Sequence, residues 1–271
     1  MTEPSRPPFA TVHDLGFSHG PIRALRNVTL SFHPGRHYIV AGPNGAGKST
    51  LLDLLCNLKR PREGSVRIDG RAPAVYAPGR LAQLVALAPQ EYHLDFSFTI
   101  REIVAMGRRP YLDRWGRLAK EDRDAVEQAL CDMHLDAIAD KSVMALSGGE
   151  KRRSIVARAL AQTTPMLLLD EPTAGLDVAQ ALSVMAHAQR MAETGSLVVT
   201  VSHDLNLAAR FGHECIFLKN GTLAANGPIA AVFTDEVLSK VYDADARVSC
   251  DEFTGAPAVS FNIQDNGPGA L

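Results

Sequence analysis

A glycine-rich stretch near residue 45 carries the clearest chemical pattern in the sequence. Residues 42–50 read GPNGAGKST, which matches the pattern G-x-x-x-x-G-K-[ST] between a strand-like and a helix-like segment. Glycines let backbone N–H groups approach a triphosphate, and the start of the next helix adds a favourable dipole. We expect Lys48 to bind the β- and γ-phosphates and Ser49 to ligate Mg²⁺. The alternative is an ordinary glycine-rich turn. The expected nucleotide contacts are Gly42, Pro43, Asn44, Gly45, Ala46, Gly47, Lys48, Ser49 and Thr50.

Two adjacent carboxylates end a second apolar segment. Residues 166–172 read MLLLDEP, and open α/β sheets place their ligands at the carboxyl ends of the strands. Because neighbouring strand residues point to opposite sides, one carboxylate can reach Mg²⁺ while the other addresses an attacking water. We assign Asp170 to the metal and Glu171 to the role of general base. The alternative is an acidic pair that only caps the following helix.

Two further polar residues follow strand-like segments. The stretch SLVVTVSHD places His203 at the end of an apolar run, and Asp204 beside it suits the N-cap of a helix through LNLAAR. His203 is a candidate contact for the γ-phosphate, although a single histidine after a strand is more often a structural hydrogen-bonding residue. Gln90, in APQEYH, is a weaker candidate, because an isolated loop glutamine usually faces solvent.

A second glycine-rich helix start lies at residues 145–153, which read ALSGGEKRR. It combines a serine cap, glycines that allow close backbone approach and the positive end of a helix, but it has no phosphate-binding lysine. It therefore has the features of half a phosphate site, or of a plain capped helix with glycines in its loop. The basic clusters at 59–60, 108–109 and 151–153 fit solvated helix ends better than a track for nucleic acid.

The segments around these residues alternate between strand and helix patterns. Strand-like runs such as 37–42 and 196–201, with helices between them, predict a mostly parallel sheet covered by helices. From residue 99 to 161 the pattern is helical, with capping boxes at TIRE and SGGE. Helices are also expected over 51–58 and 178–194, and hairpins at Asn220-Gly221 and within 248–263.

The composition predicts a cytosolic protein that recognises its partners locally. The 28 Lys and Arg and 30 Asp and Glu give a formal charge of -2, which offers no reason to expect nucleic acid or anionic lipid as a partner. The four Cys lack CxxC spacing, which favours free thiols in a reducing compartment. The N-terminus has no signal-peptide core, and every apolar run is shorter than the roughly 20 residues of a membrane helix. Trp115 is expected to pack on the helical segment rather than face a partner.

Taken together and in this order, GPNGAGKST, Gln90, LSGGE, LLLDEP, AGLD and His203 resemble the ATP-binding cassette ATPases. The resemblance runs from about Phe9 to Asp243. It implies an α/β fold with a P-loop NTPase (RecA-like) core, an N-terminal antiparallel β subdomain and an α-helical subdomain inserted at about 97–161. It divides the chain into a flexible arm at 1–8, one cassette domain at 9–250, and a C-terminal hairpin and tail at 251–271.

The resemblance also implies a head-to-tail dimer in which LSGGE closes over the ATP held by the phosphate loop of the other copy. Within LSGGE, the residues expected at that nucleotide are Ser147, Gly148, Gly149 and Glu150, with Ser147 and Gly149 on the γ-phosphate. Asp177 of AGLD is expected to cross the dimer interface.

Further roles implied by the resemblance fall on residues of the same chain. His203 matches the switch position of the family, and Gln90 is expected to sense both Mg²⁺ and the transmembrane partner. One position departs from the family pattern: where an aromatic ring often stacks on adenine, FSHG offers His19, with Phe17 two residues earlier.

Three stretches resemble importer cassettes for iron-siderophore, haem and vitamin B12 chelates: FSFTIREIVAMGRRPYL, HDLNLAARF and KVYDADARVSCDEFTGAP. This branch implies ATP and Mg²⁺ as cofactors and a peripheral position on the cytoplasmic face of the membrane. It also implies a polytopic permease, whose short helix enters a groove near Gln90, and an indirect link to a substrate-binding protein. Siderophore, haem, corrinoid and metal oxyanion stay open as cargo. One rival is an exporter cassette, which is usually fused to membrane helices that this sequence does not show. The other is a soluble cassette acting on nucleic acid or ribosomes, which would want a coiled-coil insertion, a second cassette or a basic face, and none of these is visible.

Overall fold

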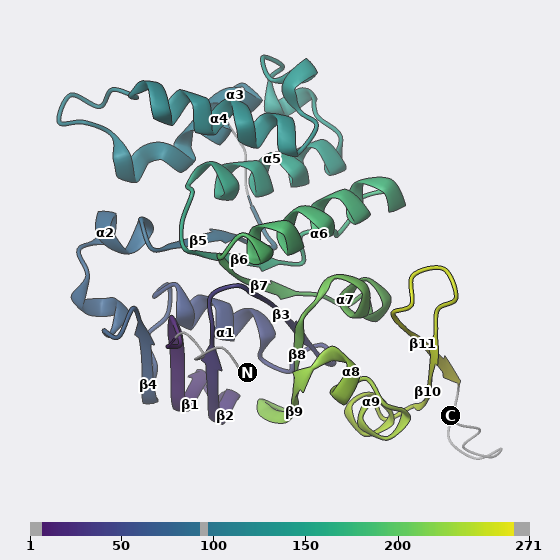
Figure 1. Cartoon of the computed structure of the whole chain (residues 1–271). Helices are drawn as coiled ribbons and strands as arrows, with labels where there is room; N and C mark the ends of the chain where they lie inside the picture. Colours follow the sequence, from purple (N-terminus) through teal and green to yellow (C-terminus); the bar gives the residue numbers. More distant parts are fainter. Residues whose placement is uncertain (1–6, 93–96, 263–271) are drawn as a thin grey trace, which may run out of the picture.

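A six-stranded sheet forms the centre of the molecule (Figure 1). The computed structural model describes residues 7–92 and 97–262. The strand order is β5-β6-β7-β3-β8-β9, and neighbouring strands are parallel except for the antiparallel pair β8 and β9. The strand bounds are β3 Arg36–Ala41, β5 Val85–Ala88, β6 Met166–Asp170, β7 Leu197–Val201, β8 Glu214–Lys219 and β9 Thr222–Pro228.

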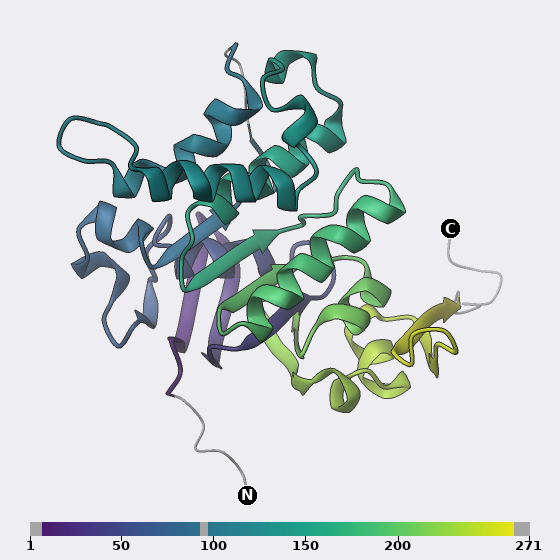
Figure 2. The ribbon, with the colours of Figure 1, turned by 45° about the horizontal axis from the view of Figure 1, so that its top comes forward.

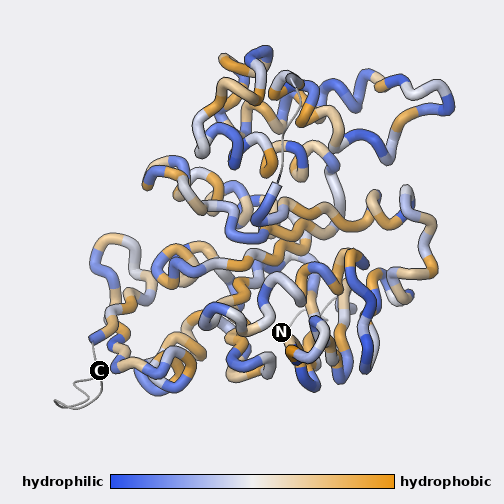
Figure 3. The backbone as a smooth tube through the Cα atoms, turned by 180° about the vertical axis from the view of Figure 1, so that it is seen from behind, coloured by the Kyte–Doolittle hydropathy of each residue, from blue (hydrophilic) through white to orange (hydrophobic). Residues whose placement is uncertain are grey.

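The strands of this sheet are buried on both faces. Every residue of β6 and of β7 is buried, as expected for parallel strands covered on both sides. Along β3, Tyr38 and Val40 join one hydrophobic cluster while Ile39 and Ala41 join another, because successive strand residues point to opposite faces. Figure 3 shows the hydrophobic segments running through the middle of the molecule.

A smaller antiparallel sheet packs on one side of this core. Its order is β2-β1-β4, with β1 Ala10–His19, β2 Ile22–Phe32 and β4 Glu63–Ile68. The helix α1 (Lys48–Leu55) joins the same hydrophobic cluster as both sheets. Short helices at η1 (Pro73–Val75) and α2 (Pro78–Ala82) lead from β4 to β5. The phosphate-loop sequence therefore lies between two sheets.

A layer of helices covers the opposite side of the parallel sheet (Figures 1 and 2). The elements are α3 Ile100–Ala105, η2 Met106–Tyr111, α4 Lys120–Asp132, η3 Asp136–Ile138, η4 Val143–Ala145, α5 Gly148–Ala161 and α6 Val178–Glu193. The hydrophobic cluster of this layer includes Leu167 and Leu169 of β6 and Ile155 and Val156 of α5.

The C-terminal part covers the end of the sheet near β8. It contains α7 Leu205–Phe211, α8 Ile229–Val232 and α9 Asp235–Tyr242, followed by the strands β10 Asp245–Cys250 and β11 Pro257–Asn262. The two strands form an antiparallel hairpin in which Asp245 pairs with Asn262. The hairpin rests on α7, where the backbone N–H of Val259 donates to Asn206 Oδ1 at 2.8 Å.

The structure confirms the predicted fold class and both hairpins, but one predicted helix is wrong in its bounds. Both capping boxes are present, at Thr99 with Glu102 and at Ser147 with Glu150. The helix expected over 51–58 begins at Lys48 and ends at Leu55, because the left-handed Gly47 starts it. The domain boundaries remain a prediction, and residues 1–6 of the arm and 263–271 of the C-terminal segment lie outside the described residues. Within residues 7–92 and 97–262, no helix is long and apolar enough to cross a membrane.

Candidate functional site

The phosphate-loop sequence forms a tight loop at the carboxyl end of β3. Gly42 has a φ of 140°, and a Cβ there would lie 2.0 Å from the carbonyl oxygen of Leu218. Gly47 has a φ of 98°, and a Cβ there would lie 2.4 Å from the carbonyl oxygen of Ala24. Only glycine avoids both collisions. Gly47 is also the N-cap of α1 and offers no side-chain cap, so the first N–H groups of this helix are left for a ligand.

Lys48 points into this loop. The side chain is buried, and Nζ donates to the carbonyl oxygens of Gly42 and Pro43, both at 2.9 Å. Burial lowers the pKa of Lys48, while the charges of Glu171 and Asp170 oppose that shift. An ammonium group held by two carbonyl oxygens can transfer its hydrogen bonds to phosphate oxygens. This arrangement fits the predicted role of Lys48.

Ser49 and Asp170 meet across the loop. Ser49 Oγ donates to Asp170 Oδ1 at 3.2 Å, and Asp170 is 7% exposed at the end of β6. Burial raises the pKa of Asp170, and the hydrogen bond from Ser49 lowers it. Adjacent hydroxyl and carboxylate oxygens are the donors that Mg²⁺ takes from proteins alongside phosphate oxygens. The donor set therefore fits the metal predicted for it.

Glu171 lies just beyond the strand, and its carboxylate meets His203. The distance from His203 Nε2 to Glu171 Oε1 is 2.7 Å. The sequence argument placed both acidic residues on one extended strand, but Glu171 has a φ of 50°, so its backbone is left-handed. This conformation costs a non-glycine residue roughly 1–2 kcal/mol. The turn, and not strand alternation, therefore separates Glu171 from Asp170.

A cleft of about 680 Å³ joins the loop to this pair. Gln90, which follows β5 and is exposed, lines it together with residues of the loop and the pair. The carboxyl ends of β3, β5, β6 and β7 meet here, as expected for a ligand site in an open α/β sheet. The residues around the cleft are Asn44, Gly45, Ser49, Gln90, Glu171 and His203.

The second glycine-rich helix start does not line this cleft. Ser147 caps α5 by accepting from the N–H of Glu150 at 3.2 Å, and Glu150 Oε2 accepts from the N–H of Ser147 at 2.8 Å. A Cβ on Gly149 would lie 3.2 Å from Gln180 Oε1, so the helix start packs against α6. Asp177 caps α6 by accepting from the N–H of Gln180 at 2.8 Å. Within one chain, residues 147–150 and Asp177 therefore hold structure rather than complete the cleft.

The ring pair proposed for adenine lies at the other side of the loop. His19 Nε2 is 3.2 Å from Thr50 Oγ1. The rings of Phe17 and His19 meet edge to face with centroids 4.9 Å apart, and Phe17 also lies under Lys59 Nζ at 5.9 Å. His19 thus adjoins the nucleotide loop and Phe17 lies beside His19, and which of them stacks on adenine remains a prediction.

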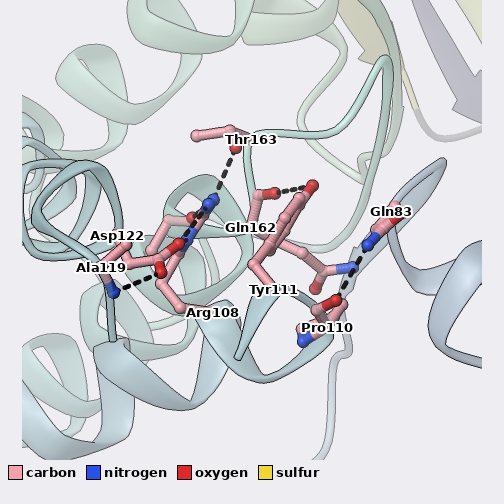
Figure 4. Close-up of polar contacts among 9 residues, drawn as sticks. Gln83, Arg108, Pro110, Tyr111, Ala119, Asp122, Gln162 and Thr163 are labelled. Atoms are coloured by element: carbon pink, nitrogen blue, oxygen red, sulfur yellow. Dashed lines mark hydrogen bonds and ion pairs between the residues drawn. The ribbon is translucent and has the colours of Figure 1, made fainter. Parts of the chain in front are cut away.

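Three arginines expected to be solvated are buried, which corrects the interpretation of their clusters. Arg108, Arg152 and Arg153 are 6%, 3% and 8% exposed. Arg108 Nη2 forms an ion pair with Asp122 Oδ1 at 2.7 Å. Figure 4 shows this pair among contacts that fix η2, including Arg108 to Thr163, Tyr111 to the carbonyl oxygen of Gln162, and Gln83 to that of Pro110. Trp115 is 70% exposed, so its predicted packing is wrong.

Arg152 is the residue near the cleft that the sequence argument missed. Its guanidinium donates to the carbonyl oxygen of Gln90 at 3.2 Å and to that of Glu171 at 2.6 Å. Burial lowers the pKa of Arg152, and the charges of Tyr92, Asp170 and Glu171 oppose that shift. A signal was present, because Arg152, Val156 and Ala159 follow the i, i+4, i+7 spacing of a buried helix face.

Comparison with known proteins identifies the family of this chain. A family model described as ABC transporter matches residues 25–174. The chain is 41% identical over 249 residues to the hemin import ATP-binding protein HmuV of Rhodococcus jostii, covering 90% of this chain and 83% of that protein. The chain belongs to the ABC transporter family.

Further relatives agree with this family. The cassette is 36% identical over 248 residues to the iron(3+)-hydroxamate import ATP-binding protein FhuC of Bacillus subtilis, covering 91% of this chain and 92% of that protein. A chain of a metal-chelate type ABC transporter in an inward-facing conformation matches with a TM-score of 0.80 at 26% identity, covering 94% of this chain and 97% of that one. A dimeric cassette bound to ADP and Pi matches with a TM-score of 0.72 at 30% identity, covering 81% and 98%.

The family confirms the resemblance drawn from the sequence motifs. The cassette is an ATPase, and its fold is the one that the resemblance implied. Its similarity to import ATP-binding proteins confirms the branch suggested by the three longer stretches. The roles of the individual residues are proposals.

Proposed function

We propose that this cassette hydrolyses ATP as one of two head-to-tail subunits and powers the uptake of a metal chelate through a separate membrane permease. The contact between Glu171 and His203, in one cleft with the phosphate loop, is the observation that carries the catalytic part. Relatives named for the import of hemin and of iron(3+)-hydroxamate support the transport part. Iron chelates of the haem or siderophore type are therefore the cargo that we propose first.

Hydrolysis begins with Lys48 exchanging the carbonyl oxygens of Gly42 and Pro43 for the β- and γ-phosphates. Ser49 and Asp170 would hold Mg²⁺, and Gln90 would contact it from the loop after β5. When bound, the ion would neutralise charge on the phosphate oxygens. Glu171 accepts a proton from the attacking water. His203, in contact with Glu171 Oε1, orients that carboxylate and reaches the γ-phosphate side of the cleft.

A second copy supplies what this cleft lacks. Ser147 and Gly149 stand at a capped helix start that does not line the cleft of their own chain. A helix N-terminus attracts phosphate, so we place this one, with Asp177, against the nucleotide of the other copy. ATP then closes the pair, because each γ-phosphate makes contacts that ADP cannot make, and hydrolysis releases it.

The permease docks beside the loop at Gln90. Exposed apolar side chains lie on segments that precede and follow this loop in the sequence: Val75 is 68%, Met106 is 41% and Trp115 is 70% exposed. The buried contacts of Arg108 in Figure 4 fix η2, which carries Met106, against the end of α5. A rigid segment with apolar side chains suits a short amphipathic helix. The exposure of Trp115, an error in the sequence prediction, thus supports the docking of a partner.

Replacing Glu171 tests the catalytic part. Glu171→Gln keeps the shape of the side chain but removes the base, so hydrolysis should fall by about 100-fold or more while ATP binding persists. Glu236→Gln is the matched control, because Glu236 is an exposed residue of α9 that does not line the cleft. ATP hydrolysis at the parental rate in Glu171→Gln would exclude Glu171 as the base.

Copurification and reconstitution test the transport part. The cassette is expressed with the genes beside its own, and a polytopic permease should copurify with it. In vesicles containing the complex, haem, a ferric hydroxamate or cobalamin with its binding protein should raise ATP hydrolysis. Recovery with ribosomes or DNA instead, with no response to any chelate, would favour the soluble rival.

A further inference from the structure

Arg152 connects the helical layer to two segments at the cleft, Pro89 with Gln90 and Asp170 with Glu171. It lies on α5, five residues after the cap Ser147, and is 3% exposed. Nη1 donates to the carbonyl oxygens of Pro89 at 2.6 Å and Gln90 at 3.2 Å. Nη2 donates to the carbonyl oxygen of Glu171 at 2.6 Å and also to that of Asp170. One buried guanidinium therefore serves four backbone carbonyls.

The sheet topology explains how one side chain reaches both segments. β5 and β6 are parallel neighbours, with Ala88 opposite Leu169, so the chain leaves both strands at the same edge. Pro89 and Gln90 follow β5, while Asp170 ends β6. The planar fork of an arginine has two ends that can bond separate groups, which a lysine ammonium cannot reproduce. From its place on α5, Arg152 therefore bridges the carboxyl ends of β5 and β6.

We propose that Arg152 is the positioning residue that holds the Gln90 loop and the turned backbone of Glu171 in their working arrangement and makes α5 move with them. This inference rests on the proposed function, since it gives that site its mechanical link. Three hydrogen bonds hold the backbone of Glu171 in its left-handed turn. Its N–H donates to the carbonyl oxygen of Val201 at 3.1 Å, and its carbonyl oxygen accepts from the N–H of Ala174 at 3.2 Å and from Arg152. Without Arg152, the bond that ties this strained residue to α5 is lost.

The same link joins the two half-sites of one chain. α5 begins directly after its cap Ser147, which the proposed function places against the nucleotide of the other copy, and it carries Arg152 to the residues that act on its own nucleotide. A shift of Gln90 or Glu171 on hydrolysis therefore moves the helix start that the other pocket needs. Arg152 does not touch the nucleotide, and it acts through the backbone of residues that do.

Arg153 provides a matched control in the next position. It is 8% exposed on the same helix, and its Nη1 donates to the carbonyl oxygens of Met133 at 2.7 Å and His134 at 3.0 Å. Both acceptors lie within the helical layer. In the part of the chain that the structure describes, the Nε atoms of Arg152 and Arg153 alike have no hydrogen-bond partner. The two arginines therefore differ mainly in what they hold.

The experiment compares Arg152→Met, Arg152→Lys and Arg153→Met in the complete transporter. Arg152→Met should lower kcat by about 10- to 100-fold, while KM for ATP stays within about threefold. Arg152→Lys should fall between this variant and the parent, because an ammonium group bonds only part of the four carbonyls. Arg153→Met should lower the thermal midpoint and leave kcat within about twofold of the parent.

Hydrogen exchange gives a readout that does not depend on activity. In the folded full-length protein, Arg152→Met should speed amide exchange in peptides covering 88–92 and 168–173, and Arg153→Met should do so around 130–136 instead. Parental kcat in both Arg152 variants would overturn the proposal. The proposal would also be overturned if Arg153→Met lost as much kcat as Arg152→Met at the same fall in thermal midpoint. The loss of activity would then follow from general loss of stability alone. If Arg152→Met does not fold, Arg152→Lys decides.

Failure of the proposed function is a separate result. A parental protein that hydrolyses no ATP with its permease present would overturn that function, whatever Arg152 does. The exchange pattern would still decide whether Arg152 holds the two strand ends. The two conclusions can therefore fail independently.

Discussion

The two glycine-rich helix starts of this cassette satisfy their backbone groups in opposite ways. At the first, Gly47 is left-handed and gives α1 no side-chain cap. At the second, Ser147 is extended and forms a complete capping box with Glu150. The first helix therefore keeps free N–H groups for a ligand, whereas the second has already satisfied two of its own.

The packing around the two starts differs in the same sense. A Cβ on Gly42 or Gly47 would collide with backbone oxygens of neighbouring strands, while nothing lies within 4 Å of a Cβ on Gly148. The first loop is shaped by its own chain, and the second presents an open face. One chain therefore carries both a loop suited to enclose phosphate, at residues 42–50, and a surface suited to approach it, at the start of α5.

Alanine at one glycine of each start should give the largest contrast. Gly47→Ala places a Cβ 2.4 Å from the carbonyl oxygen of Ala24 at a φ of 98°, so the free energy of unfolding should fall by about 3 kcal/mol. Gly148→Ala meets open space in a helix, where alanine is favoured over glycine by up to about 1 kcal/mol. Urea unfolding of the two variants measures this. Equal losses would show that the two starts are built alike.

Low pH should destabilise the fold at β3, the strand that leads into the first loop. His37 on β3 is fully buried, with Nδ1 3.0 Å from the carbonyl oxygen of Phe211 and Nε2 2.8 Å from Thr200 Oγ1. A carbonyl oxygen only accepts, so Nδ1 donates and the neutral ring satisfies both contacts. Burial lowers the pKa of His37 to about 4, and the bond to Phe211 opposes this shift while His213 adds to it.

Because the unfolded chain binds the His37 proton more tightly, stability is full above about pH 6.5 and is lost as the pH falls toward 4. Between pH 7.5 and 5 this histidine should cost about 2 kcal/mol of the free energy of unfolding. Urea unfolding at several pH values measures the slope, and His37→Gln should flatten it by that amount. An unchanged slope in His37→Gln would assign the acid sensitivity to other groups such as His213.

The sequence predicted much of this arrangement because local rules and the fold agree there. Buried parallel strands such as β6 and β7 are largely apolar runs, and the capping boxes at Thr99 and Ser147 depend only on residues three positions along. The proposed role of Lys48 came from its place in the pattern G-x-x-x-x-G-K-[ST], and that of Asp170 from its place at the end of a strand.

What the sequence did not predict depends on contacts between distant segments. The left-handed turn at Glu171 is held by β7 and by α5, neither of which is near it in the chain. Arg152 is buried because two strand ends offer it four carbonyl oxygens, and a count of basic residues alone suggests a solvated cluster. The start of α1 at Lys48 requires the left-handed Gly47, which residue pattern alone does not specify.

Ser147→Ala should give the smallest change in stability and sharpen the contrast most directly. Loss of the cap should cost about 1 kcal/mol of the free energy of unfolding, measured by urea unfolding. Its effect on hydrolysis should appear in the other pocket. Mixed dimers separate the two, since Ser147→Ala in one copy and Glu171→Gln in the other put both defects in one pocket and leave the second intact.

The same two changes in a single copy damage both pockets, because each acts on a different nucleotide. Dimers with the changes in different copies should therefore hydrolyse ATP severalfold faster than dimers with both changes in one copy. If Ser147 served the pocket of its own chain, the order of the two rates would reverse. The comparison holds the number of substitutions constant, so a general loss of stability cannot produce the difference.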